Sequence, residues 1–187
     1  MVKKNTCVFI SGAGSNLEAL IKNSRSYNFP INIKLIISNN KKAKGIIFAK
    51  KYLIPYKIFN MKNYLAETNI LKELTVRKIS LICLAGYMKI LSKEFLKNYK
   101  GKIINIHPSL LPKYKGLNTF KRILKNDEKI AGCTVHYVSQ DLDSGKVILK
   151  KTFKISKSDD EKSLKKKTQN LEYKAFSEAI RKIYLSN

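Results

Sequence analysis

Residues 6–17 have the sequence TCVFISGAGSNL, which joins an apolar run to a glycine-rich turn and the start of a helix. The apolar residues 6–10 predict a buried strand, and the helix is predicted to begin near Asn16 and Leu17. Glycines allow a tight turn, and exposed N–H groups at a helix N-terminus favour an anion such as phosphate. An alternative is a plain tight turn in which Ser15 or Asn16 caps the helix.

The same alternation of strand and helix continues along most of the chain. Further strands are predicted at residues 33–37, 55–59, 79–85 and 102–105, and helices at residues 41–52, 63–78 and 92–99. Strands that alternate with helices pair in parallel in a doubly wound sheet. Two strands joined by a short loop follow at residues 132–138 and 146–150, and a helix follows at residues 159–184. The pattern predicts an α/β fold with a doubly wound, mostly parallel, Rossmann-like sheet, a C-terminal antiparallel hairpin and a long terminal helix. We expect a single domain over residues 1–187.

A second informative stretch is NIHPSLLP at residues 105–112, after the apolar end of a predicted strand. Residues two apart in an extended segment point to the same side, so Asn105 and His107 can face one small volume. An amide can stabilise an oxyanion, and an imidazole can move a proton near neutral pH. The pair predicts a transferase-like or hydrolase-like site. The alternative is that His107 only hydrogen-bonds the backbone. For the other histidine, His136, we expect a structural or supporting role rather than catalysis.

Composition restricts the function classes further. The net charge is +25, but only four of the 38 basic residues are arginine and the lysines are spread along the chain. Arginine is the favoured residue for phosphate and base contacts, so a dedicated nucleic-acid-binding protein is disfavoured. The three cysteines form no paired motif and fit core packing, and no metal-ligand spacing is present. No apolar stretch approaches the roughly 20 residues of a membrane helix, and no signal peptide is evident, so we expect a cytoplasmic protein without a membrane partner.

Three blocks in order resemble the folate-dependent formyltransferases: VFISGAGSNL at residues 8–17, LAGYMKIL at residues 84–91, and NIHPSLLPKYKG at residues 105–116, continued by LDSG at residues 142–145. The resemblance implies formyl transfer from 10-formyltetrahydrofolate, as a co-substrate, to the amine of glycinamide ribonucleotide in purine synthesis. It implies no metal, and a monomer or homodimer. The alternatives are another folate-dependent formyltransferase, formyltetrahydrofolate hydrolase, or a basic nucleic-acid-binding module on the same fold.

The resemblance also assigns residues to roles. The catalytic residues it implies are Asn105, His107 and Asp143, with Asp143 raising the pKa of His107 and keeping its imidazole charged. The residues it implies for the ribonucleotide are Gly14, Ser15 and Asn16 at the phosphate and Glu172 at the ribose. Those it implies for folate are Met88, Lys89, Ile90, Leu91, Asn105, Gln140 and Asp141. Met88–Leu91 could instead be core, and Glu172 could be a solvent-facing helix residue. An arginine that usually binds folate has no clear counterpart near Lys62 and Asn63.

Overall fold

The computed structural model describes residues 2–185. The chain divides into two compact units, residues 1–104 and residues 105–187, and each is described by itself. The expectation of a single domain stays a prediction.

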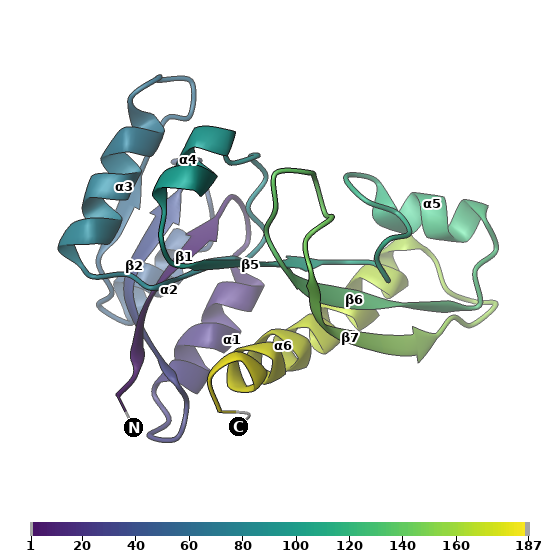
Figure 1. The fold of residues 1–187 in the computed structure, drawn as a ribbon. Coiled ribbons are helices and arrows are strands. Elements are labelled where there is room, and N and C mark those ends of the chain that lie inside the picture. Colours follow the sequence, from purple (N-terminus) through teal and green to yellow (C-terminus); the bar gives the residue numbers. More distant parts are fainter. Residues whose placement is uncertain (1, 186–187) are drawn as a thin grey trace. The chain divides into compact units, whose positions relative to one another are not determined.

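The first unit alternates strands and helices. Its elements are β1 (Lys4–Ile10), α1 (Ser15–Ser24), β2 (Ile31–Ser38), α2 (Ile46–Lys51), β3 (Tyr56–Ile58), α3 (Ala66–Val76), β4 (Leu81–Leu84) and α4 (Lys93–Asn98). The strand pairs β1–β2, β2–β3 and β1–β4 are parallel. Helix α1 lies on one side of these strands, and α3 and α4 lie on the other (Figure 1). Helices on both faces bury residues 7–10 of β1 and all of β4, which explains the continuous apolar sequences CVFI and LICL.

The second unit is built on a hairpin and one long helix. Strand β5 (Lys102–His107) begins beside β4, where the Lys102 N–H donates to the Ser80 carbonyl at 3.0 Å, and continues into the second unit. Helix α5 (Thr119–Lys125) and the antiparallel strands β6 (Ile130–Tyr137) and β7 (Val147–Lys154) follow. Helix α6 (Glu161–Leu185) packs against β6 and β7 (Figure 1). Within residues 2–185 the strand order is β3-β2-β1-β4-β5-β6-β7, so the predicted fold class is confirmed.

Three local predictions were wrong. The helix predicted over residues 41–52 begins only at Ile46, because the Asn40 side chain accepts from the Lys42 N–H at 2.9 Å and holds a turn. Helix α5 was not predicted; it has seven residues and follows Asn118, which adopts a left-handed conformation. Strand β5 extends to His107, so this histidine lies on the strand rather than in the following loop.

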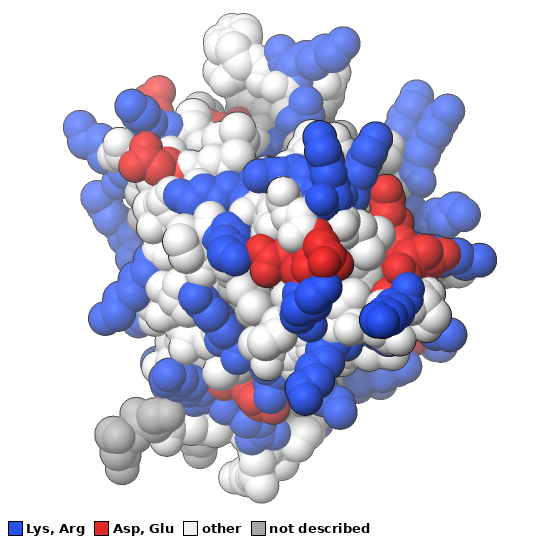
Figure 2. Space-filling view, turned by 90° about the vertical axis from the view of Figure 1, so that its right-hand side faces the viewer, with Lys and Arg blue, Asp and Glu red and all other residues white. Residues whose placement is uncertain are grey.

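Basic side chains on one face of the molecule are distributed rather than gathered (Figure 2). On the face drawn in Figure 2, lysine and arginine side chains are interrupted by acidic groups and by uncharged surface. Among residues 2–185, no helix has both the length and the apolar character needed to cross a membrane.

Candidate active site

The glycine-rich loop of the first unit is held in place by backbone contacts. Gly14 has a φ of 76°, and a Cβ there would lie 2.5 Å from the Gly45 Cα, so only glycine fits. The Gly45 N–H donates to the Gly12 carbonyl at 2.9 Å. On the other side, the Ser11 hydroxyl accepts from the Met88 N–H at 2.8 Å. The loop is thus fixed between the start of α2 and the segment after β4.

Helix α1 begins immediately after this loop. Its N-cap is Gly14, which has no side chain, and Ser15 and Asn16 lie inside the helix. The alternative in which Ser15 or Asn16 caps the helix is therefore wrong. No side chain caps α1 at Gly14, and a helix N-terminus favours an anion. Phosphate binding by Gly14, Ser15 and Asn16 stays a prediction that this geometry favours.

The segment from Met88 to Leu91 follows β4 in the same unit. Met88 and Ile90 are 69% and 72% exposed, whereas Leu91 is buried. The interpretation of this segment as core is therefore right for Leu91 and wrong for Met88 and Ile90. These two exposed apolar side chains, just after the end of strand β4, offer a surface on which a flat ring can lie.

The second unit contains a compact polar cluster at the end of β5. His107 Nδ1 lies 3.2 Å from Asp143 Oδ2, and Asn105 Nδ2 donates to Asp143 Oδ1 at 3.4 Å. His136 from β6 completes the cluster, with its Nε2 3.2 Å from Asn105 Nδ2 and 3.6 Å from Asp143 Oδ1. The structure brings together the three predicted catalytic residues and adds the second histidine.

The local backbone explains why these side chains converge. Asn105 and His107 alternate along β5, so both point to the same side, as predicted. Asp143 has a φ of 49°, a left-handed conformation that Asp tolerates better than most residues. The loop of Asp143 closes tightly at Gly145, which lies close to the Tyr137 carbonyl oxygen. A Cβ at this position would be only 1.7 Å from that oxygen, so the close approach requires glycine. The predicted folate residues Gln140 and Asp141 lie exposed in this same loop.

Burial and hydrogen bonds set the protonation of the cluster. Burial lowers the pKa of His107, and the Tyr114 carbonyl, 2.9 Å from Nε2, and the Asp143 carboxylate offset this only in part. Burial alone would raise the pKa of Asp143, but the neighbouring His136 ring, the hydrogen bond from the Gly116 N–H and the His107 charge lower it. The expectation that Asp143 raises the pKa of His107 is therefore incomplete: the carboxylate has that effect, but desolvation exceeds it.

Two backbone groups belong to this cluster and were not predicted. The Gly116 N–H donates to Asp143 Oδ2 at 2.9 Å, and the Tyr114 carbonyl faces His107 Nε2. Neither has a side-chain signature, so no residue pattern could have indicated them. In the part of the chain that the structure describes, no three His, Cys, Asp or Glu side chains gather as metal ligands would.

Glu172 lies on α6 and is buried, so the interpretation as a solvent-facing helix residue is wrong. Burial first, and the Glu172 charge second, raise the pKa of the Cys133 thiol on β6 to about 12. Glu172 therefore lies near enough to β6 for its charge to act on Cys133. Its contact with a ribose stays a prediction.

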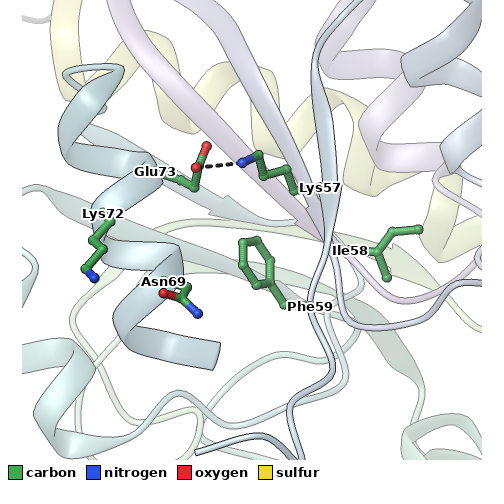
Figure 3. Close-up of a pocket in the computed structure, with 6 residues that line it drawn as sticks. All are labelled: Lys57, Ile58, Phe59, Asn69, Lys72 and Glu73. Carbon is green, nitrogen blue, oxygen red and sulfur yellow. Dashed lines mark hydrogen bonds and ion pairs between the residues drawn. The ribbon is translucent and has the colours of Figure 1, made fainter. Parts of the chain in front are cut away.

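A hollow of about 350 Å³ lies elsewhere in the first unit (Figure 3). Its lining residues come from β3, the residue after it, and α3: Lys57, Ile58, Phe59, Asn69, Lys72 and Glu73. Lys57 and Glu73 form an ion pair at 2.6 Å. None of the predicted site residues lines this hollow.

The glycine-rich loop and the polar cluster both lie in a stretch of the chain that matches a known protein family. Residues 4–180 match the model of the family described as formyl transferase. The chain belongs to the formyl transferase family. The match includes the glycine-rich loop, the segment after β4 and the Asn105, His107 and Asp143 cluster.

Individual relatives agree with this assignment. The chain is 38% identical over 182 residues to the phosphoribosylglycinamide formyltransferase of Haemophilus influenzae, covering 95% of this chain and 86% of that protein. It is 37% identical to the chicken trifunctional purine biosynthetic protein adenosine-3, covering 95% of this chain but only 18% of that protein. The crystal structure of phosphoribosylglycinamide formyltransferase from Brucella melitensis matches with a TM-score of 0.92 at 35% identity, covering 99% of this chain and 97% of that one.

Proposed function

We propose that this protein transfers the formyl group of 10-formyltetrahydrofolate to the amine of glycinamide ribonucleotide. The observation that carries the proposal is the cluster of the half-buried Asn105 with the buried His107 and Asp143 in a member of the formyl transferase family. Relatives of similar length named phosphoribosylglycinamide formyltransferase support the choice of acceptor. The cytoplasm is the proposed location, because purine synthesis from these soluble substrates takes place there.

The reaction exchanges one carbon–nitrogen bond for another. The unprotonated substrate amine attacks the formyl carbon, and the carbonyl electron pair moves onto oxygen. The tetrahedral intermediate then expels the folate nitrogen, which takes up the proton lost by the amine. A site for this reaction must stabilise an oxyanion and carry one proton between two nitrogens.

The cluster has groups suited to both tasks. Asn105 supplies N–H groups that can donate to the oxyanion, and the low local dielectric of a buried site strengthens such a hydrogen bond. His107 and Asp143 lie 3.2 Å apart, which gives a short path for a proton. Because burial lowers the pKa of His107, its imidazole releases a proton readily near neutral pH.

The remaining predicted site residues are proposed to bind the two substrates. The glycine-rich loop with Gly14, Ser15 and Asn16 would hold the ribonucleotide phosphate, and Glu172 its ribose hydroxyls. The exposed Met88, Lys89, Ile90, Gln140 and Asp141 would contact the folate, whereas Leu91 lies in the core.

A spectrophotometric assay tests the proposal with the purified chain. Folate product is measured from 10-formyltetrahydrofolate in the presence and absence of glycinamide ribonucleotide. Product that forms only with the ribonucleotide supports the transferase. Product formed without it would indicate a hydrolase, and no product from a folded sample would exclude both activities.

A further inference from the structure

The two ring nitrogens of His136 face different partners, and those partners determine which nitrogen holds the proton. Nδ1 lies 2.8 Å from the Tyr137 carbonyl oxygen, which can only accept, so Nδ1 must be the donor. Nε2 lies 3.2 Å from Asn105 Nδ2, which can only donate, so Nε2 must be the acceptor. The ring is therefore the neutral imidazole with its hydrogen on Nδ1. His136 is 2% exposed, so water does not compete for either nitrogen.

The orientation of the Asn105 amide is determined independently by Asp143. The carboxylate oxygen Oδ1 can only accept, and it lies 3.4 Å from Asn105 Nδ2. A rotation of the amide by 180° would turn the Asn105 carbonyl oxygen toward the acceptor Asp143 Oδ1. That contact would then be repulsive, so the amide is held with its NH₂ group inside the cluster.

We propose that His136 is a positioning residue, whose neutral Nε2 orients the Asn105 amide so that an N–H, rather than the carbonyl, serves the reaction. This inference rests on the proposed formyl transfer. His136 holds one hydrogen of Asn105 Nδ2 at 3.2 Å, and the second faces Asp143 across the longer distance of 3.4 Å. The longer and weaker contact is the one that yields to a developing oxyanion.

Nitrogen NMR of the wild-type chain tests the tautomer without any variant. The chain has two histidines, so imidazole ¹⁵N signals are assigned by comparison with a single His107→Gln sample. At pH 7.5 we expect His136 to show a protonated Nδ1 and an unprotonated Nε2. A hydrogen on Nε2, in either the other tautomer or the cation, would overturn the proposal.

A double-mutant cycle tests the coupling to Asn105. His136→Leu removes the acceptor, and we expect kcat to fall about tenfold, with KM for the ribonucleotide changed less than twofold. His136→Gln places an amide oxygen near the position of Nε2, and we expect it to recover most of that loss. In an Asn105→Ala background, His136→Leu should have almost no further effect on kcat.

The outcomes separate this inference from the proposed function. If the wild-type chain transfers no formyl group to glycinamide ribonucleotide, the proposed function fails, whereas the NMR result still decides the tautomer. If the wild type is active but His136→Leu lowers kcat tenfold both in the wild-type background and in the Asn105→Ala background, the positioning role is wrong. Thermal unfolding of each variant shows whether a lost activity reflects lost structure.

Discussion

Asp143→Asn is the substitution that isolates the charge of the cluster. Asparagine has nearly the same shape as aspartate and tolerates the left-handed backbone at this position, where φ is 49°. Its amide oxygen can still accept from the Gly116 N–H, now 2.9 Å away. The substitution removes the negative charge 3.2 Å from His107 Nδ1 and one of the two acceptor oxygens.

The size of the effect follows from that distance. At an effective dielectric constant of about 20, a proton on His107 is attracted to the Asp143 carboxylate across this distance by about 5 kcal/mol. A hundredfold loss of rate corresponds to about 2.7 kcal/mol, roughly half of this attraction. We therefore expect kcat to fall by about a hundredfold or more, while the free energy of unfolding falls by only about 1–2 kcal/mol.

The assay is steady-state formyl transfer at pH 7.5, with urea unfolding of the same samples. Asp127→Asn is the matched control, because Asp127 also has a positive φ, 47°, but its side chain is 87% exposed. We expect this control to change kcat less than twofold. A loss below fivefold in Asp143→Asn, with the control unchanged, would show that proton transfer does not depend on the carboxylate charge.

Three further predictions follow from the same structure. Gly14→Ala should raise KM for glycinamide ribonucleotide at least tenfold with a smaller change in kcat, since its Cβ would meet Gly45; steady-state kinetics measure this. The pKa of His107 is lower in the folded chain than in the unfolded chain, where it is about 6.5. As the pH falls below about 6.5, the unfolded chain therefore takes up a proton that the folded chain does not, and the free energy of unfolding should fall. In urea unfolding, the difference in this free energy between pH 7 and pH 5 should be smaller for His107→Gln than for the wild type. No acidic residue occurs between residues 19 and 66, so the positive charge of this segment should attract the anionic substrates, and kcat/KM should fall as salt screens that attraction. The fall should be less steep when the exposed lysines beside the glycine-rich loop, Lys41, Lys42 and Lys44, are replaced by glutamine. An equal salt slope in wild type and variant would refute the last expectation.

The alternation of apolar strands with helices determined the fold class, because a parallel strand needs a crossover connection and apolar residues on both faces. Short elements were less predictable. Helix α5 has seven residues, too few for a clear periodic pattern, and the start of α2 depends on Asn40 and on the approach of Gly45 to Gly14.

The strand alternation in NIHPSLLP was sufficient to place Asn105 and His107 on one side, because side chains two apart on a strand point the same way. The third member, Asp143, came from resemblance, since nothing local connects it to a strand 36 residues earlier. Only the tertiary structure showed His136 within hydrogen-bonding distance of Asn105. It also showed that burial outweighs the carboxylate in setting the pKa of His107. Desolvation depends on every atom packed around a group, and those atoms come from segments far apart in the sequence.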